Sequence, residues 1–237
     1  MDKPTPSGRP LREIFGEIAG SYERVNRVLT LGLDRGWRRR AARRAARGGG
    51  SRWLDVCSGT GEMARDLARL APAGTEIAAV DFSLPMLARA RTKPGLERTG
   101  FVLGDVKRLP FPDATFDLVT ISFATRNINI SRPILEATFR EFLRVLRPGG
   151  RFVNLETSQP AVPVVRALFH AYVGILVRRV GWRMSGALAG YAYLASSIRA
   201  FYGPGELAGI LLGAGFDEVA FERLFFGAAA IHVSRKR

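Results

Sequence analysis

One short segment constrains the fold of this chain more than any other: Asp55-Val56-Cys57-Ser58-Gly59-Thr60-Gly61-Glu62. It directly follows an apolar run at 52–54 and precedes a helical pattern near 61–71. Glycine residues let the backbone turn sharply there, and they let a ligand approach where a Cβ atom would collide. Because ligands of open parallel sheets bind at the carboxyl ends of the strands, the segment predicts a ligand-binding loop in an α/β fold.

Short apolar runs alternate with helical patterns along the rest of the chain, which is typical of βαβ units around a largely parallel sheet. The predicted strands lie at 52–57, 76–81, 100–103, 116–122, 151–156, 217–224 and 228–234. The predicted helices lie at 61–71, 84–92, 132–147 and 204–213. Pro148-Gly149-Gly150 predicts a sharp end to the third of these helices and a turn into the next strand.

The length of 237 residues fits one large domain, and we expect residues 11–237 to form it. Residues 1–10 are polar, with no apolar signal-peptide core, so we expect a flexible tail there. The helical pattern at 11–47 predicts an N-terminal helical cap. The segment 158–200, rich in Ala, Gly and Leu, predicts a helical lid over a substrate pocket. No stretch reaches the roughly 18 to 20 apolar residues of a transmembrane helix.

The chain carries a formal net charge of +15 and a single cysteine, Cys57. One cysteine excludes an intramolecular disulfide and a zinc site of paired cysteines, and it predicts a reducing, cytoplasmic compartment. Much of the positive charge lies in one basic run, made of Arg35, Arg38, Arg39, Arg40, Arg43, Arg44, Arg47 and Arg52. The run predicts either an anion-binding face or a solvated helix, because its charge pattern specifies no partner. Base-stacking aromatic residues are not interleaved with these arginines, so we expect no nucleic-acid partner.

The glycine loop also indicates which kind of ligand is bound. It lacks the lysine and Ser/Thr pair of a phosphate-binding P-loop, and Ala64 replaces the third glycine of the dinucleotide fingerprint. An adenosine ligand without a diphosphate needs no such glycine, and S-adenosylmethionine (SAM) is that ligand. Asp81 ends the next predicted strand, where a carboxylate can accept hydrogen bonds from both ribose hydroxyls. Asp105 follows the third strand and can accept the adenine amine.

Three acidic residues, Asp55, Asp81 and Asp105, thus lie at three consecutive strand ends. Each alone is also explained as a helix or turn cap, but three of them beside a glycine loop favour a SAM site. The residues expected to contact SAM are Asp55, Ser58, Gly59, Thr60, Gly61, Asp81, Phe82, Met86, Asp105, Val106 and Ser122. No metal cluster is apparent in the sequence, and the chemistry requires none.

Two further motifs carry a resemblance to a known family. The first reads Tyr22-Glu23-Arg24-Val25-Asn26, then Leu29-Thr30 and Trp37; the second runs from Arg144 to Phe152 and continues as Leu155-Glu156-Thr157-Ser158. On these motifs the chain resembles, over most of its length, the quinone-biosynthesis C-methyltransferases of the UbiE type. It departs from the family at Asp34, Gln159 and Ser196, where His, Lys and Glu are usual.

The resemblance implies a Rossmann-like class I methyltransferase, with a seven-stranded, mostly parallel sheet, an antiparallel last strand, helices on both faces and a helical lid. It implies methyl transfer from SAM to the ring of a lipophilic, prenylated quinol of the demethylmenaquinone or ubiquinone-precursor type. Arg126 is implied to stabilise the ring phenolate, since a guanidinium stays protonated. Arg199 and Tyr193 are implied to lie at the acceptor pocket.

The sequence leaves other functions and partners open. The departures at Gln159 and Ser196 allow another small or lipophilic acceptor. The basic run allows a non-catalytic SAM-fold protein that binds nucleic acid. For a membrane-embedded substrate, an apolar lid and a basic surface predict peripheral association with an anionic membrane, at its inner face. A homodimer also stays open.

Overall fold

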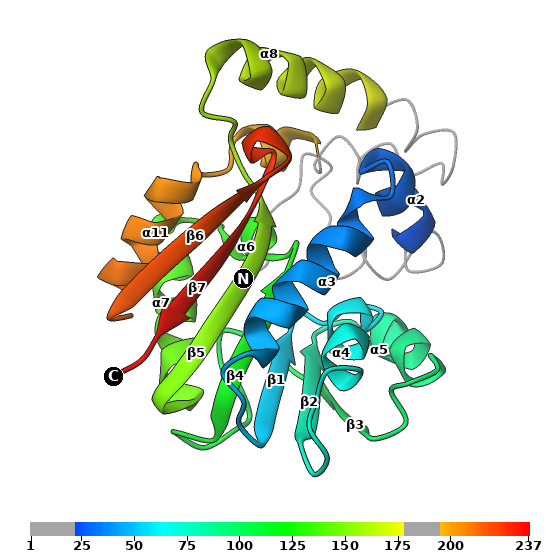
Figure 1. Ribbon diagram of the computed structural model, residues 1–237, viewed down its shortest axis with the longest axis vertical. Helices are drawn as coiled ribbons and strands as arrows, with labels where there is room; N and C mark the ends of the chain where they lie inside the picture. Colours follow the sequence, from blue (N-terminus) through cyan, green and yellow to red (C-terminus); the bar gives the residue numbers. More distant parts are fainter. Residues whose placement is uncertain (1–21, 178–194) are drawn as a thin grey trace.

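The computed structural model describes residues 22–177 and 195–237, and a seven-stranded sheet lies at its centre (Figure 1). The order of the strands across the sheet is β3-β2-β1-β4-β5-β7-β6. Strands β1 to β5 pair in parallel, whereas β7 runs antiparallel between β5 and β6. The predicted sheet is therefore confirmed. The strands are β1 (Arg52–Val56), β2 (Glu76–Asp81), β3 (Thr99–Leu103), β4 (Phe116–Ser122), β5 (Leu146–Thr157), β6 (Glu218–Leu224) and β7 (Ala229–Arg235).

Helices connect the strands and cover the carboxyl edge of the sheet (Figure 1). None within the described ranges is long and apolar enough to cross a membrane. The helices are α2 (Tyr22–Leu29), α3 (Leu33–Ala46), α4 (Glu62–Ala68), α5 (Leu84–Arg91), α6 (Thr125–Ile128), α7 (Arg132–Val145), α8 (Pro163–Tyr172), the π-helical turn η1 (Val173–Val177), α11 (Pro204–Gly213) and the 3-10 turn η2 (Phe225–Gly227).

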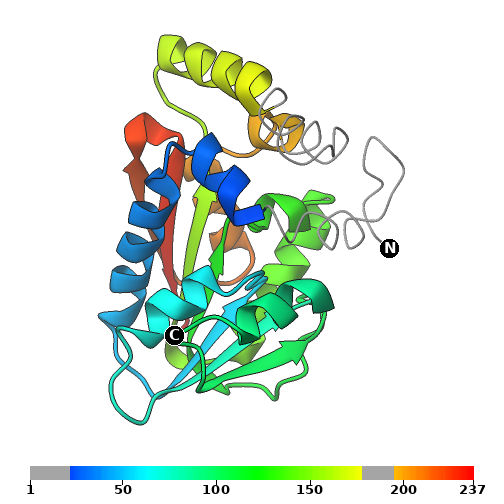
Figure 2. The same ribbon diagram turned by 90° about the vertical axis from the view of Figure 1, so that its right-hand side faces the viewer.

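The alternation of side chains along each strand builds a core on both faces of the sheet. Trp53 of β1 packs with α3 and α4 on one face, whereas the next residue, Leu54, packs with α7 and α11 on the other. Figure 2 shows helices on both faces of the sheet. Phe152 of β5 belongs to the second layer, with its ring centre 5.4 Å from that of Phe142. Because both faces are covered, the central strands are apolar almost throughout, as parallel strands usually are.

The helical pattern at 11–47 is interrupted within its described part. Helix α2 ends at Leu29 and α3 begins at Leu33. Between them Leu31 and Gly32 have φ angles of 53° and 77°, the left-handed region that terminates a helix. The N–H of Gly32 donates to the Arg27 carbonyl at 2.7 Å and so closes α2. The chain therefore enters the domain as two helices joined by a tight turn.

Strand β5 begins earlier than the predicted start at 151. Leu146 already pairs with Phe116 of β4, and regular pairing resumes at Arg151 after an irregularity. Pro148-Gly149-Gly150 therefore lies inside the strand as an irregular stretch rather than between a helix and a strand. The apolar pattern alone missed this because the tripeptide has no side chain suited to a buried strand.

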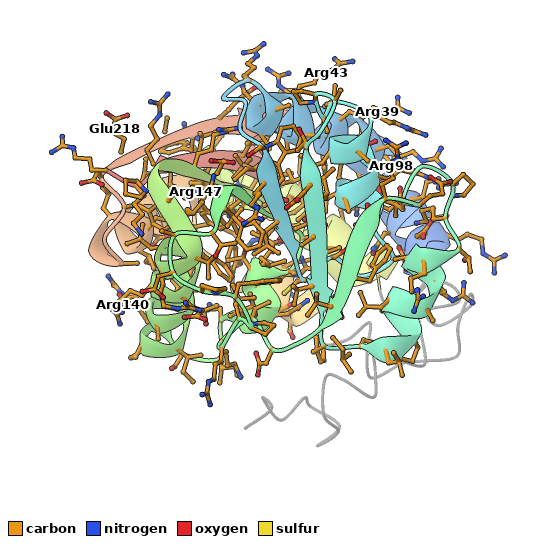
Figure 3. All side chains as sticks on the ribbon, turned by 90° about the horizontal axis from the view of Figure 1, so that it is seen from below. Arg39, Arg43, Arg98, Arg140, Arg147 and Glu218 are labelled. Atoms are coloured by element: carbon orange, nitrogen blue, oxygen red, sulfur yellow. The ribbon has the colours of Figure 1, made fainter. Side chains whose placement is uncertain are left out.

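The basic run is divided between two environments. Four of its arginines form ion pairs: Arg38 with Asp34, Arg40 and Arg44 with Glu222, and Arg52 with Glu76. Only Arg38 is buried, and the other seven arginines of the run are exposed. Figure 3 shows Arg39 and Arg43 projecting from the surface. The run is therefore mainly a solvated face, and its exposed ion pairs contribute little to stability.

Asp55 is buried beneath the glycine loop, with an exposed fraction of 1%. The hydroxyl of Thr120 on the neighbouring strand β4 donates to its Oδ1 atom at 2.8 Å. Burial disfavours the charged form and raises the pKa of this carboxyl to about 7, although the Thr120 hydrogen bond opposes the rise. Because the folded pKa lies above the unfolded value, this group opposes folding increasingly as the pH rises from about 4 to 7.

We expect NMR titration of the side-chain carboxyl carbon of Asp55 to give a midpoint near 7. Asp117 is the matched control, because hydrogen bonds from the Arg52 and Ser51 N–H groups outweigh its partial burial and lower its pKa. Its midpoint should lie below that of an ordinary aspartate, roughly 4. A midpoint for Asp55 at or below that ordinary value would contradict the prediction.

Candidate active site

The glycine loop joins β1 to α4 and is held by its own backbone. The N–H of Ser58 donates to the Val80 carbonyl at 3.0 Å, and the N–H of Gly61 donates to the Ser58 carbonyl at 2.9 Å. Gly59 and Gly61 have φ angles of 56° and 78°, which favour glycine. A Cβ atom on Gly61 would lie 2.7 Å from Leu96, whereas one on Gly59 would have no neighbour within 4 Å. Gly61 therefore allows the loop to pack closely against Leu96, whereas Gly59 leaves open space beside the loop.

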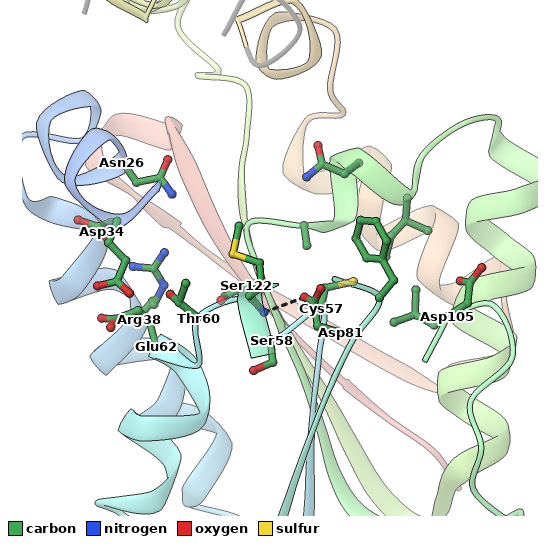
Figure 4. Close-up of a pocket in the computed structure, with 18 of the residues that line it drawn as sticks. Asn26, Asp34, Arg38, Cys57, Ser58, Thr60, Glu62, Asp81, Asp105 and Ser122 are labelled. Atoms are coloured by element: carbon green, nitrogen blue, oxygen red, sulfur yellow. Dashed lines mark hydrogen bonds and ion pairs between the residues drawn. The ribbon is translucent and has the colours of Figure 1, made fainter. Parts of the chain in front are cut away.

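A first cavity lies at the carboxyl ends of β1, β2 and β4, against this loop (Figure 4). Its accessible volume is about 140 Å³, and it opens to solvent. The structure brings most of the residues predicted to contact SAM to its wall. They are Ser58, Gly59, Thr60, Asp81, Phe82, Met86, Asp105, Val106 and Ser122.

Asp81 holds the loop against the start of α5. Its Oδ2 atom accepts the N–H of Gly59 at 2.8 Å, and its Oδ1 atom accepts the N–H of Ser83 at 2.8 Å. Burial raises the pKa of this carboxyl, while the two amide hydrogen bonds lower it. A carboxylate oxygen has two lone pairs, so these bonds leave acceptor capacity for ribose hydroxyls. Asp105 is exposed, and its Oδ1 atom accepts the Lys107 N–H at 3.0 Å.

Asp55 and Gly61 do not line the cavity, so direct contact of either residue with a ligand is not what the structure indicates. The Asp55 carboxylate lies under the loop and faces Thr120. Asp55 pairs with Ala79, two residues before Asp81, so both carboxylates lie on the same side of the sheet but Asp55 lies farther from its carboxyl edge. Asp55 supports the loop. The three strand-end aspartates are equivalent in sequence spacing, although only Asp81 and Asp105 reach the cavity.

Residues of α2 and α3 complete the first cavity, and the sequence did not single them out as ligands. They are Glu23, Asn26, Arg27, Asp34 and Arg38. The ammonium of Lys93 bridges Glu23 at 2.7 Å and Glu62 at 2.6 Å, and so ties α2 to the first turn of α4. The signal that would have found them is the first family motif, which includes Glu23 and Asn26.

A second, mostly apolar cavity of about 340 Å³ adjoins the first. Asn26, Asp34 and Arg38 line both cavities. The apolar wall of the second comes from α3, α8, η1, η2 and residues 195–199, and includes Trp37, Phe123, Leu168, Phe169, Tyr172, Val173, Ile198, Phe225 and Phe226. A polar cavity at the glycine loop therefore continues into an apolar one beneath α8.

Gln159 helps to place the wall formed by α8. Its amide nitrogen donates to the Ile198 carbonyl at 2.8 Å, and its amide oxygen lies 2.7 Å from Nε2 of His170. The side chain thus connects α8 to residues 195–199. This is one of the positions at which the chain departs from the resembled family, and here the substituted residue acts as a link between two walls of the cavity.

Arg126 lines the second cavity and is 5% exposed. Its Nη1 atom donates to Glu156 at 2.6 Å and to the Phe123 carbonyl at 2.9 Å. The guanidinium is therefore fixed in the wall as a buried cation. Arg199 is exposed and is not among the described residues that line either cavity, and Tyr193 lies outside the described residues.

No group of three or more His, Cys, Asp and Glu side chains in the described part of the chain is arranged to hold a metal ion. The first cavity is lined by carboxylates, by hydroxyl and amide groups and by the cations Arg27, Arg38 and Lys107, beside apolar side chains such as Phe82 and Met86. This mixture suits a nucleoside, because a base needs an apolar surface and a ribose needs hydrogen-bond acceptors.

Comparison with known proteins gives a family for this architecture. The sequence profile of the ubiE/COQ5 methyltransferase family matches residues 5–236. The chain is 42% identical to a demethylmenaquinone methyltransferase of Deinococcus radiodurans, over 97% of this chain and 94% of that protein. It is 36% identical to the ubiquinone/menaquinone biosynthesis C-methyltransferase UbiE of Geobacter sulfurreducens, over 100% of this chain and 92% of that protein.

Solved structures share the fold at low sequence identity. Human N-acetylserotonin methyltransferase in complex with SAM is 18% identical, with a TM-score of 0.64 over 97% of this chain and 61% of that one. A putative methyltransferase of Haloferax volcanii, in complex with its Trm112 activator, is 18% identical with a TM-score of 0.67, over 93% and 96% respectively. Because the family profile matches nearly the entire chain, this protein belongs to the ubiE/COQ5 methyltransferase family.

Proposed function

We propose that the protein methylates a ring carbon of a prenylated quinol, of the demethylmenaquinone or ubiquinone-precursor type, with SAM as methyl donor. The observation that carries this proposal is the junction of the two cavities. The first has the amides and carboxylates of a nucleoside site, the second is apolar and suits a prenylated ring, and three residues line both. Donor and acceptor bound in adjoining cavities meet in one place, which is the main requirement of a group transfer.

The residues of the first cavity fit SAM. The open space beside Gly59 admits a ligand against the loop backbone, and the Asp81 carboxylate faces the same cavity. We assign the ribose hydroxyls to Asp81, the adenine to Asp105, Phe82 and Val106, and the methionine part to residues 58–60 and Ser122. When bound, SAM supplies an electrophilic methyl group on a sulfonium. The chain supplies orientation, exclusion of water and the placement of charge.

The second cavity positions the acceptor ring. An aromatic carbon becomes nucleophilic when a ring hydroxyl loses its proton, so a cation beside that oxygen favours the reactive form. Arg126 is the buried cation we assign to this role, because Glu156 and the Phe123 carbonyl hold its guanidinium in the cavity wall. The apolar surface from Leu168, Phe169 and Ile198 suits the prenyl tail.

Exposed apolar side chains lie on the α2–α3 turn, at α8, on η1 and on η2, and we call them the apolar rim: Leu31, Val162, Val164, Leu168, Ile175, Phe225 and Phe226. Of these, Leu31, Leu168, Phe225 and Phe226 line the second cavity. Leu31 is 70% exposed and Phe226 78% exposed, and each has a positive φ angle, at 53° and 55°. Such backbone conformations cost on the order of 1–3 kcal/mol and cluster at functional sites. The α2–α3 turn, η2 and α8 lie at the same end of the molecule (Figure 1).

We assign the apolar rim to an anionic membrane surface, at its cytoplasmic face. Arg35, Arg166 and Arg199 are exposed near it, and α8 carries no acidic residue. A prenylated quinol resides in the membrane, so a cavity that opens at the bilayer surface takes up its substrate without passage through water. A second copy of the chain covering the same rim is the alternative occupant.

Purified protein should transfer labelled methyl from SAM to a demethylmenaquinol presented in vesicles. The same protein should not label duplex DNA or a tail-free catechol above background. Methyl transfer confined to the tail-free acceptor would contradict the quinol assignment while leaving the enzyme class intact. Binding of duplex DNA without any methyl transfer would favour the non-catalytic alternative.

Substituting Asp81→Asn should weaken SAM binding at least tenfold in calorimetry at pH 8. An amide nitrogen cannot accept the Gly59 or Ser83 N–H, and loss of a hydrogen bond to a charged group costs about 1.5–3 kcal/mol. The matched control Asp217→Asn removes an exposed carboxylate near Arg237 and should bind SAM normally. Burial raises the pKa of Asp81, so its carboxylate takes up a proton at a higher pH than an ordinary aspartate does. As the pH is lowered, the affinity of the wild type for SAM should therefore begin to fall at that higher pH. Equal affinities of the Asp81 variant and wild type would contradict the assignment.

The double variant Val162→Glu/Val164→Glu should lose at least tenfold in binding to vesicles that contain phosphatidylglycerol, measured by co-sedimentation at low salt. Both side chains are exposed on the apolar rim but do not line the cavity. The matched control Leu84→Glu/Leu212→Glu adds the same charge at exposed sites away from the rim and should bind as wild type. Equal binding of all three proteins would contradict membrane docking. A dimer that the rim variant dissociates would assign the rim to a second copy.

A further inference from the structure

Asp34 is the only carboxylate among the described residues that line the second cavity, and it lines the first cavity as well. It lies in the first turn of α3 and is 5% exposed. A buried carboxylate is costly unless it is paired. Asp34 is therefore a group that can accept a proton at the place where the two cavities join.

Two groups hold Asp34 in place. The Thr30 hydroxyl donates to Oδ1 at 3.0 Å, and Nη1 of Arg38 donates to Oδ2 at 2.5 Å. Asp34 and Arg38 are four residues apart, so α3 presents them one above the other on the same face. Figure 4 shows the two side chains together at the α3 side of the first cavity. The pair is a neutral unit, in which a carboxylate and a cation both border the acceptor space.

Phe123 connects this pair to Arg126. The guanidinium carbon of Arg38 lies 5.0 Å from the centre of the Phe123 ring, and Nη1 of Arg126 donates to the Phe123 carbonyl. The φ angle of Phe123 is 56°, an uncommon conformation for a phenylalanine. Two buried cations thus border the same residue in the cavity wall. Arg126 has a buried carboxylate partner, Glu156, that does not line either cavity, whereas the partner of Arg38 lines both.

We propose that Asp34 accepts the proton of the acceptor's ring hydroxyl and that Arg38 then stabilises the phenolate together with Arg126. This inference rests on the proposed function. Proton transfer converts Asp34 to its neutral acid, so the positive charge of Arg38 becomes available to the phenolate and the total charge of the cavity is unchanged. A cation placed where negative charge develops lowers the barrier most effectively in a water-poor site.

The proposed step conserves protons and electrons. The O–H electron pair of the ring hydroxyl moves into the ring, and the ring carbon forms a bond to the methyl carbon. The C–S bond of the donor breaks, and its electron pair stays on sulfur. The methylated carbon then loses its ring proton to water, and Asp34 returns the first proton to the oxygen. The net products are the methylated quinol, the demethylated donor and one proton.

A purely structural pair that only fixes the first turns of α3 would explain the same contacts, and the pH profile separates the two roles. At pH 7, Asp34→Asn should lower kcat about 100-fold, within the usual contribution of a general base. Its rate should rise about tenfold per pH unit toward the ionisation of the free hydroxyl, near 10 for a phenol. KM and SAM affinity should change less than threefold. The matched control Glu222→Gln, which faces Arg40 and Arg44 on the outer side of α3, should keep the wild-type profile.

A binding measurement tests the cation of the pair without turnover. The probe 4-methoxy-1-naphthol, added to protein saturated with the demethylated donor, should show the absorbance of its anion at a pH at least one unit higher in the double variant Asp34→Asn/Arg38→Met than in Asp34→Asn. The double variant lacks the cation that stabilises the anion, whereas the single variant keeps it without its carboxylate partner.

An Asp34→Asn enzyme with the wild-type rate would overturn the inference. So would a rate loss that high pH does not restore, or a naphthol ionisation that the loss of Arg38 leaves unmoved. A naphthol ionisation that depends on Arg38 in a protein that methylates no quinol would instead overturn the proposed function and leave the anion-stabilising role of Arg38 in place.

Discussion

The two hydrogen bonds that the Asp81 carboxylate accepts from Gly59 and Ser83 determine the shape of the site. They fix the glycine loop after β1 to the start of the helix after β2, so the ends of two neighbouring strands become one surface. The arrangement is costly, because burial raises the pKa of both Asp81 and Asp55. Carboxylates kept in such positions are a mark of functional sites rather than of stability.

The cap of α2 and α3 turns this surface into an enclosed site. Lys93 ties α2 to α4 through Glu23 and Glu62, and Arg151 donates to the Ala45 and Gly49 carbonyls at the far end of α3. These contacts hold α3 along one face of the sheet, with its first turn at the carboxyl edge beside both cavities. A single helix therefore supplies walls to both cavities, which is why its polar residues reach donor and acceptor alike.

Apolar surface is distributed unequally around these cavities. The core on both faces of the sheet is fully covered, whereas the apolar rim of the second cavity is exposed, and three of its residues have left-handed backbone conformations. Such backbone conformations are uncommon for residues other than glycine. The membrane surface proposed above would cover these side chains and would match the arginines beside them.

The sequence by itself determined the strands, the glycine loop and its neighbouring carboxylates, because those depend on local periodicity and on short-range backbone geometry. It also indicated the family, through the motifs at 22–37 and 144–158. Only the tertiary structure decided which carboxylates face the cavity. Asp55 and Asp81 are equivalent in the sequence pattern, yet Asp55 pairs with Ala79, two residues before Asp81, and so lies under the loop while Asp81 lies at the cavity. Likewise, Arg38 belongs to a run that the sequence describes only as basic, and Asp34 directly precedes that run. Their function depends on the packing of α3 against residues about ninety positions away, such as Phe123, and local sequence carries no record of so distant a contact.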